Sequence, residues 1–457
     1  MDDAARPHGF DIAIIGGGAA GTMVAIHALR SATTPLRIAL VEPATPGQGV
    51  AYATTHSEHL LNVPVRGMSA FVDAPEDFLD FIAADGDDRE ALGRMFVQRH
   101  RYADYLQARL EQARAASPAQ LHPYLGRAVA LEDEDGTLHL TLDDGTRLSA
   151  RGVALAVGNA PRKLPIQGAE NLPDAQRPSA WDFDAVKHLP ADADVCIAGS
   201  GLSMVDAALS LAANGHRGRI HVLSRHALLP LSHAPAAKAE LDVPALLALP
   251  LRRRMHALRM AAREAAATGQ PWQAVMDALR PHGQALWRSL SPADQRRFLR
   301  HAVRYWDVHR HRIAPQVHVQ LQALVNSGQI RLHRGRLHAA EMAGAKVRVH
   351  ARMRDGRDDC FDVDALINAT GMETRVQAMD NPLLSDLLDK GLAVAGAHGI
   401  GIRSDDEGRV VDAQGHPRPE LRVLGSLRIG DLWESTAVPE LRGQAETAAR
   451  ALLAALL

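Results

Sequence analysis

The stretch DIAIIGGGAAGTMVAIHALR, Asp11–Arg30, decides the fold class. The apolar run Asp11–Ile15 predicts a β-strand, and the segment from about Ala19 to Leu29 predicts an α-helix. Between them lies a G-x-G-x-x-G pattern formed by Gly16, Gly18 and Gly21. In such a pattern the first glycine allows a tight turn, the second lets backbone approach a pyrophosphate, and the third lets helix and strand pack closely. The start of the helix, Ala19 and Ala20, then offers free N–H groups to phosphates.

A second strand, predicted over Leu36–Val41, is followed directly by Glu42. In dinucleotide-binding units an acid at the end of this strand accepts hydrogen bonds from ribose hydroxyls. The glycine pattern alone is weak. Its combination with strand, helix, second strand and acid, in that order, predicts a dinucleotide site at the N-terminus.

The same arrangement recurs in DVCIAGSGLSMVDAALSLAANGHRGRIHVLSRH, which begins at Asp194. The predicted strands are Asp194–Ala198 and Arg219–Leu223, and Met204 stands where the third glycine would be. The second strand leads into Ser224-Arg225-His226 without an acid. An arginine there can pair with the 2′-phosphate of NADPH, which an acid would repel; the alternative is that Arg225 is a solvated surface charge.

A β-rich region follows each module. Each contains an Asp-Gly turn, at Asp144-Gly145 and Asp355-Gly356, which predicts a hairpin. Each closes with a strand that ends in small residues, ALAVGN and LINATG, where Gly158 and Gly371 would let the chain pass close to a cofactor.

Composition excludes several classes of protein. The chain has 457 residues, 23% of them charged, with a formal net charge of −2, which argues against a nucleic-acid binder driven by bulk charge. The two cysteines, Cys196 and Cys360, are far apart, so no dithiol centre is predicted. No apolar run reaches the ~18 residues of a transmembrane helix, and the N-terminus lacks a signal core, so we expect a cytoplasmic protein.

Three long strings extend the interpretation: GQGVAYATTHSEHLLNVPVRGMSAF (Gly47–Phe71), LWRSLSPADQRRFLRHAVRYWDVHRHRIAP (Leu286–Pro315) and GDLWESTAVPELRGQA (Gly430–Ala445). With the two glycine turns, they resemble the two-dinucleotide-binding-domain flavoproteins and, more narrowly, the YdhS-like bacterial FAD/NAD(P)-binding proteins. The resemblance implies an α/β fold with two Rossmann-like dinucleotide-binding domains, the second inserted into the first, and a helical insertion. We expect FAD-binding parts at residues 1–189 and 361–457, and an NADPH-binding domain at 190–360 that contains the insertion 231–315.

The resemblance also implies site residues. Gln48, Asn62 and Met68 would line the flavin, unless Gly47–Phe71 is an ordinary surface loop. Gly430 and Asp431, after a strand predicted at Val423–Leu427, would meet the ribityl chain and pyrophosphate. A helix capped by Ser435 or Thr436 would direct its N-terminus at the flavin edge, or would simply pack. The expected FAD contacts are Gly16, Gly18, Ala19, Ala20, Gly21, Glu42, Gln48, Asn62, Met68, Gly158, Gly430, Asp431, Thr436 and Ala437. The expected NADPH contacts are Gly199, Gly201, Leu202, Ser203, Ser224, Arg225 and Gly371.

The insertion 231–315 is basic and has apolar spacing for two to four helices. It could be a lid over the active site, a docking surface for a membrane or an acidic partner, or a packing subdomain. Within WDVHRHRIAP, alternation would direct His309 and His311 the same way if the segment were extended. The catalytic candidates are Trp306, His309, Arg310, His311 and Arg312. No metal site is predicted, because no carboxylate or cysteine completes one beside the histidines.

Two cofactors imply electron relay from NADPH to FAD. Because disulfide reductases of this superfamily use a cysteine pair, the resemblance favours the N-hydroxylating and Baeyer–Villiger monooxygenases, in which the reduced flavin activates dioxygen to oxidise a small molecule. A Baeyer–Villiger fingerprint and an amine-binding residue are both missing. The alternatives are a reductase that passes electrons to a small-molecule or protein acceptor, and a redox sensor without catalysis. The substrate and the oligomeric state stay open.

Overall fold

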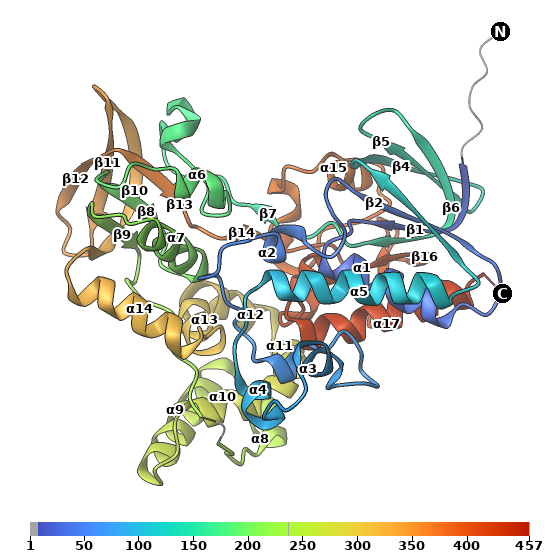
Figure 1. Ribbon diagram of the computed structural model, residues 1–457, viewed down its shortest axis with the longest axis horizontal. Helices are drawn as coiled ribbons and strands as arrows, with labels where there is room; N and C mark the ends of the chain where they lie inside the picture. Colours follow the sequence, from blue (N-terminus) through green and yellow to red (C-terminus); the bar gives the residue numbers. More distant parts are fainter. Residues whose placement is uncertain (1–7, 236, 457) are drawn as a thin grey trace. The chain divides into compact units, whose positions relative to one another are not determined.

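The computed structural model describes residues 8–235 and 237–456, and the chain divides into two compact units (Figure 1). The first unit comprises residues 1–55, 63–160 and 373–457, and the second comprises 56–62 and 161–372. The chain passes between them at β7 (Ala160–Pro161) and β14 (Met372–Glu373), among other places. The unit boundaries at 160/161 and 372/373 differ from the domain boundaries predicted at 189/190 and 360/361.

The first unit is built on an eight-stranded sheet with a parallel centre. Six of its strands follow the order β15-β16-β6-β1-β2-β3, and β5 pairs with both β6 and β4 beside them. Its strands are β1 (His8–Ile15), β2 (Arg37–Glu42), β3 (Gln120–Leu125), β4 (Ala128–Glu134), β5 (Thr137–Leu142), β6 (Arg147–Leu155), β15 (Arg409–Val411) and β16 (Pro417–Val423). The register of β1 aligns Ile15 with Val41 on one side and with Leu155 on the other. Ile12 and Ile14 on one face, and Ala13 and Ile15 on the other, are all buried, so the central strand is apolar on both faces.

Helices cover this sheet. They are α1 (Ala19–Ser31), α2 (Gly49–Tyr52), α3 (Asp77–Ile82), α4 (Arg89–Arg94), α5 (His100–Ala116), α15 (Pro382–Asp389), α16 (Ile429–Leu432) and α17 (Val438–Ala454). The longest three share one side, where α1 contacts both α5 and α17 (Figure 1). The C-terminal helix therefore closes the unit that the N-terminal strand begins, as the resemblance implied.

The second unit contains a six-stranded sheet in the order β12-β11-β10-β9-β8-β13. Its strands are β8 (Val195–Ala198), β9 (Ile220–Ser224), β10 (Ile330–Ala343), β11 (Lys346–Met353), β12 (Asp358–Val363) and β13 (Ala365–Asn368). Four neighbouring strands of this sheet, β10, β9, β8 and β13, run parallel to one another. Strands β11 and β12 extend the sheet as an antiparallel meander. Because β13 pairs with β8, the LINATG segment belongs to this sheet. Two Rossmann-like modules on parallel sheets confirm the predicted fold class.

Among the described residues, the insertion 231–315 contains six α-helices, more than the predicted two to four. They are α8 (Val243–Ala248), α9 (Leu251–Ala267), α10 (Gln273–Leu279), α11 (Gly283–Arg288), α12 (Pro292–Arg297) and α13 (Val303–Arg310), with a π-helical turn at Phe298–Ala302. The remaining helices of this unit are α6 (Phe183–Lys187), α7 (Leu202–Ala213) and α14 (Pro315–Asn326). In the parts of the chain that the structure describes, no helix is both long and apolar enough to cross a bilayer.

Both predicted hairpin turns are present: Gly145 and Gly356 have positive φ and lie between antiparallel strands. Two local predictions near the C-terminus were wrong. The strand predicted at Val423–Leu427 ends at Val423, because Gly425 has φ +72° and a 3₁₀ turn, Gly425–Arg428, follows. The last helix begins after Ala437 with no side-chain cap, since the Ser435 hydroxyl donates to the Gly425 carbonyl instead.

Candidate functional site

The first glycine turn has the construction that its pattern predicts. Gly16 has φ +94°, and a Cβ atom there would overlap the carbonyl oxygen of Ala156. A Cβ atom on Gly21 would overlap the carbonyl oxygen of Gly16, so helix α1 must start against the turn itself. Both glycines are therefore required by the close packing of strand, helix and crossing segment.

The start of α1 offers unpaired donors. Within the described chain, the N–H groups of Gly18, Ala19 and Ala20 donate to no acceptor, and the helix has neither a side-chain cap nor an acid in its first turn. A helix of 13 residues with this start presents partial positive charge and open hydrogen-bond donors to an anion. The geometry fits the pyrophosphate of a dinucleotide.

Glu42 lies at the end of β2 and is already bonded to the turn. The N–H of Gly17 donates to its carboxylate, and a Cβ atom on Gly17 would lie 2.9 Å from the Cβ of Glu42. Burial raises the pKa of Glu42, and the N–H groups of Gly17 and Ala44 oppose that shift. The predicted ribose ligand is thus held beside the glycine turn, and Gly17, which the fingerprint does not require, is the residue that holds it.

The start of the predicted flavin loop packs on the same turn. The N–H of Gly47 donates to the Gly17 carbonyl (2.8 Å). A Cβ on Gly49 would lie 3.2 Å from the Cα of Gly18, so the two backbones run in contact. Gln48, between these glycines, is the residue before α2.

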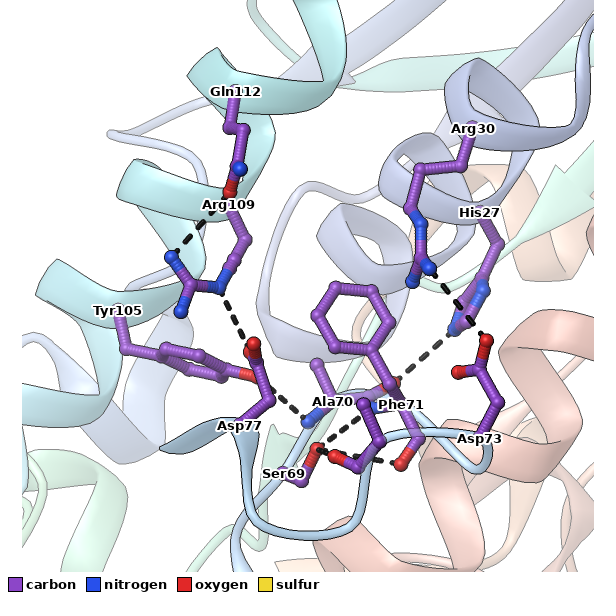
Figure 2. Close-up of polar contacts among 11 residues, drawn as sticks. His27, Arg30, Ser69, Ala70, Phe71, Asp73, Asp77, Tyr105, Arg109 and Gln112 are labelled. Atoms are coloured by element: carbon purple, nitrogen blue, oxygen red, sulfur yellow. Dashed lines mark hydrogen bonds and ion pairs between the residues drawn. The ribbon is translucent and has the colours of Figure 1, made fainter. Parts of the chain in front are cut away.

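Farther along that loop, Met68 is buried, and the segment after it is fixed by polar contacts with α1 and α5 (Figure 2). The N–H of Ala70 donates to the hydroxyl of Tyr105 (3.0 Å), which itself donates to Asp77 (2.6 Å). The guanidinium of Arg109 also donates to Asp77 (2.8 Å). Burial and the bond to Asp77 raise the pKa of Tyr105, so its hydroxyl stays a donor.

Helix α1 holds the other side of this segment. His27 Nε2 lies 3.2 Å from the carbonyl oxygen of Ala70, and the guanidinium of Arg30 lies 4.1 Å from the centre of the Phe71 ring (Figure 2). Burial lowers the pKa of His27, which favours the neutral imidazole that donates to a carbonyl. The Met68 position is therefore set from two helices.

The C-terminal site residues belong to the same unit. The Ser426 hydroxyl donates to the carbonyl of Gly158 (2.6 Å), which joins the crossing segment to the chain before α16. Asp431 accepts from both the backbone N–H (2.8 Å) and the hydroxyl (3.0 Å) of Ser404. A Cβ on Gly430 would overlap the Ile400 carbonyl, so a packing contact already accounts for that glycine.

One predicted residue of this group has other surroundings. Asn62 lies in the second unit, where His233 Nε2 is 3.0 Å from its carbonyl oxygen. Burial, with the nearby charge of Arg312, lowers the pKa of His233 to about 4. Thr436 and Ala437 directly precede α17, and Pro439 lies in its first turn.

The second glycine turn repeats the first. Gly199 has φ +114°, and a Cβ there would overlap the carbonyl oxygen of Ala369. A Cβ on Gly201 would meet nothing within 4 Å in the described chain. Helix α7 starts at Leu202 without a side-chain cap, and the Ser203 hydroxyl accepts from the indole of Trp181 (3.0 Å). This turn too leaves an open helix N-terminus for a phosphate.

The end of β9 differs from the end of β2. The hydroxyls of Ser224 and Ser200 are hydrogen-bonded (2.8 Å). Arg225 is exposed and forms no ion pair or hydrogen bond with the described residues. Partial desolvation and the positive charges of Arg304, Arg336 and Arg162 lower its pKa. Arg304 is itself paired with Asp307 (3.0 Å), and the four guanidinium groups together make an anion-attracting region.

Helix α13 of the insertion contributes to this region. It carries Arg304, and its Tyr305 ring lies 5.7 Å from the ring of His226, which follows Arg225. Gly371, which follows β13, has φ +86°, and a Cβ atom there would meet nothing within 4 Å in the described chain. The insertion therefore packs beside the nucleotide end of β9.

The catalytic candidates occupy the end of this helix. Because α13 continues to Arg310, the extended alternation expected for His309 and His311 was wrong. His309 packs edge-on against Trp272, and Trp306 packs against Phe298. Arg312 is buried and paired with Asp277 of α10, so it holds the insertion together. Arg310 is half-buried at the helix end.

Comparisons with known proteins agree with this geometry. Residues 13–160 match the model of an FAD-NAD(P)-binding family. A search of curated proteins finds no match. Among solved structures, the ornithine N-hydroxylase of Kutzneria sp. 744, determined with reduced FAD, NADP⁺ and L-ornithine, superposes with a TM-score of 0.67 at 15% identity, over 98% of this chain and 99% of that one.

Two further structures superpose over 98% of this chain and 99% of theirs. L-lysine 6-monooxygenase from Pseudomonas syringae gives a TM-score of 0.68 at 19% identity, and thioredoxin reductase from Lactococcus lactis gives 0.54 at 14%. The chain thus has the fold of FAD- and NADP-dependent oxidoreductases.

Proposed function

We propose that the protein is an FAD- and NADPH-dependent monooxygenase that oxidises a small molecule. The observation that carries the cofactor assignment is the contrast between the two strand ends: a carboxylate at Glu42 and an arginine group at Arg225. The first suits a ribose with free hydroxyls, and the second suits a ribose that carries a 2′-phosphate. The three quoted strings also support membership among the YdhS-like proteins.

In this proposal the open N–H groups of Gly18, Ala19 and Ala20 bind the FAD pyrophosphate, and Glu42 binds the adjacent ribose. Gln48 and Met68 line the cofactor from a loop that α1 and α5 hold in place. Gly158, Asp431 and the start of α17 complete the group from the C-terminal segment. When bound, FAD would accept hydride equivalents from NADPH and pass electrons onward.

On the second module, Leu202 and Ser203 begin the helix that faces the NADPH pyrophosphate, and Ser224 and Arg225 bind the phosphorylated ribose. Arg162, Arg304 and Arg336 strengthen the attraction for that phosphate because their charges reach Arg225. Residues of α13 from Trp306 to Arg310 stay candidates for substrate contacts.

The cysteines favour oxygen over a disulfide as the electron acceptor. Cys196 is buried in β8, where burial raises its pKa to about 12, and Cys360 is exposed on β12. A buried thiol with a raised pKa is a poor nucleophile. The thioredoxin-reductase likeness therefore extends to the fold, while the chain lacks the cysteine pair that such chemistry uses.

To test this proposal, the purified protein is incubated with NADPH and candidate amines, amino acids or ketones under isotopically labelled dioxygen. A monooxygenase oxidises NADPH faster with its substrate and leaves one labelled oxygen atom in the product. Hydrogen peroxide measured in parallel counts uncoupled turnover. If no product ever carries the label and artificial acceptors support the same turnover under nitrogen, the protein is a reductase. Slow NADPH turnover with every added molecule, together with a partner whose affinity changes on reduction, would favour a sensor.

A further inference from the structure

A second polar group lies in the second unit, outside the residues assigned to either dinucleotide. It consists of His56, Glu58, His59 and Ser210, which we call the His–Glu cluster. The first three come from one short segment of the chain, and Ser210 comes from the last turn of α7. We propose that the His–Glu cluster binds one divalent transition-metal ion of the Zn²⁺ class.

The potential ligand atoms converge. His56 Nδ1 lies 3.1 Å from a Glu58 carboxylate oxygen and 3.4 Å from the Ser210 hydroxyl oxygen. His59 Nε2 lies 2.9 Å from the same hydroxyl oxygen. Three potential ligand atoms, one from each of His56, Glu58 and His59, all lie within 4.8 Å of one another. In tetrahedral zinc sites with bonds of about 2.0–2.1 Å, neighbouring ligand atoms are about 3.3 Å apart, so these spacings fit.

Burial gives the site its charge requirement. The side chain of Glu58 is 14% exposed and that of His56 is 9% exposed, while His59 is fully buried. The partners of Glu58 in the described chain are His56 and the Ser57 hydroxyl, and no lysine or arginine reaches it. A carboxylate this deep needs a compensating positive charge. A bound cation can supply it.

The composition of the group favours the cation. Two imidazoles and one carboxylate form the three-ligand set of many zinc sites, with a fourth position for water or a hydroxyl. A magnesium or calcium site would instead need a shell of oxygen ligands. The centres of the Phe183 and His59 rings are 4.6 Å apart, so packing holds this histidine in place.

Such an ion would fasten the segment His56–Asn62 to helix α7 within the second unit. The proposal does not depend on which cofactor binds either glycine turn. It also departs from the sequence analysis, which considered metal ligation only at His309 and His311.

The experiment uses the full-length protein with whatever flavin it carries. Metals are removed with a chelator, and Zn²⁺ is then titrated against a chromophoric competitor, with bound metal counted by elemental analysis. The wild-type protein should bind one Zn²⁺ per chain. Glu58→Gln, which keeps the side-chain size but removes the charge, should weaken binding at least about 10-fold, and His56→Ala should do the same. Thermal unfolding and flavin content report whether each variant is folded.

The matched control is the pair His350 and Glu341, whose Nε2 and carboxylate oxygen are 3.0 Å apart in the same unit but whose side chains are 32% and 62% exposed. His350→Ala and Glu341→Gln should leave Zn²⁺ binding unchanged. Three results would overturn the proposal: a wild-type protein that takes up no stoichiometric Zn²⁺, Glu58→Gln binding as tightly as wild type, or equal losses in the control variants.

Discussion

The turns at Gly16–Gly21 and at Gly199–Met204 both join a strand to a helix, but they pack against that helix differently. In both, the first glycine has positive φ and its missing Cβ leaves room for the carbonyl oxygen of a crossing alanine, Ala156 or Ala369. In the first turn the third glycine is indispensable, because any Cβ there would overlap the Gly16 carbonyl. In the second turn Met204 takes that position and is fully buried. The third glycine therefore reflects how closely a helix approaches its turn, while nucleotide binding needs the first two.

The two strand ends differ as well. Glu42 is bonded to the first turn through the Gly17 N–H, whereas Ser224 meets Ser200 through two hydroxyls and leaves Arg225 exposed. A carboxylate and a guanidinium at matching places would divide the two dinucleotides between the modules.

The largest expected effect tests the third position of the first turn. Gly21→Ala should destabilise the first unit by at least about 3 kcal/mol, because the added methyl meets backbone that cannot rotate away. Urea unfolding and flavin content of the purified variant measure the loss. A variant with wild-type stability and flavin would show that α1 can move away from its turn without cost.

At the matching position of the second turn, a smaller side chain rather than a larger one should lower stability. Met204→Ala should cost about 2–4 kcal/mol, since it leaves a cavity beneath α7. Met342→Ala, at a site where the side chain is 40% exposed in the same unit, should change stability by less than about 0.5 kcal/mol. Equal, small changes in both variants would refute the view that Met204 fills space that a glycine would leave empty.

The proposed difference between the ends of β2 and β9 can be tested by comparing NADPH binding with NADH binding. Arg225→Ala should weaken NADPH binding by about 1.5–3 kcal/mol, because a charge-assisted bond to the 2′-phosphate is lost, and should leave NADH binding nearly unchanged. Calorimetric titration with each nucleotide measures the difference. Arg331→Ala, on β10 at the register position of His221, is the control and should affect neither nucleotide. Equal losses for NADPH and NADH on Arg225→Ala would contradict the phosphate role.

Acid should weaken the second unit more than the first. Among the described residues, burial lowers the pKa of His27 and His122 in the first unit and of His216, His221, His226, His233 and His333 in the second. For His233 the folded pKa is about 4, whereas an unfolded histidine titrates near 6.5. Between these values the unfolded chain binds the extra proton, so stability is complete above about pH 6.5 and is lost as pH falls towards 4.

At pH 5 the loss from His233 should be at most about 2 kcal/mol. Hydrogen exchange followed separately in peptides of each unit, from pH 7 to 5, measures it. His233→Gln should flatten the pH dependence of the second unit, while His188→Gln at an exposed site should leave it as in the wild type. A steeper acid response in the first unit would reverse the comparison.

The smallest effect is a gain. Gly443 lies within α17, and a Cβ there would meet nothing within 4 Å in the described chain. Gly443→Ala should stabilise the first unit by about 0.5–1 kcal/mol, because alanine loses less backbone entropy than glycine in a helix. Urea unfolding tests this gain, and the same variant serves as the control for Gly21→Ala.

Much of the fold was predictable because its signals are local. The strands beside Gly16 and Gly199, the helices that follow them and both Asp-Gly hairpins are each specified within a few residues of sequence. The fold class follows from their repetition. The strand predicted at Val423–Leu427 was misplaced because an apolar run does not reveal where a glycine adopts positive φ.

The candidate site was predictable only in part. Gly18, Glu42 and Gln48 come together at one turn, but the roles of Gly17, Tyr105 and Ser404 depend on contacts between distant segments. Arg312 was one of the catalytic candidates, and its buried pairing with Asp277 could not be deduced from a string of basic residues. The His–Glu cluster needs Ser210 from α7, so its short sequence pattern is not informative by itself.

The bond between Glu42 and the Gly17 N–H has a kinetic consequence. A carboxylate that is already held in one rotamer would lose little further freedom on binding a ribose, and the Gly47 N–H also donates to the same turn. If Glu42 and Arg225 bind the two riboses as proposed, we expect slow dissociation from the preformed turn, whereas Arg225 would have to be ordered by its ligand each time. We therefore expect the flavin to stay on the protein through many turnovers and through purification, with a residence time far longer than that of the nicotinamide nucleotide, which exchanges in every cycle.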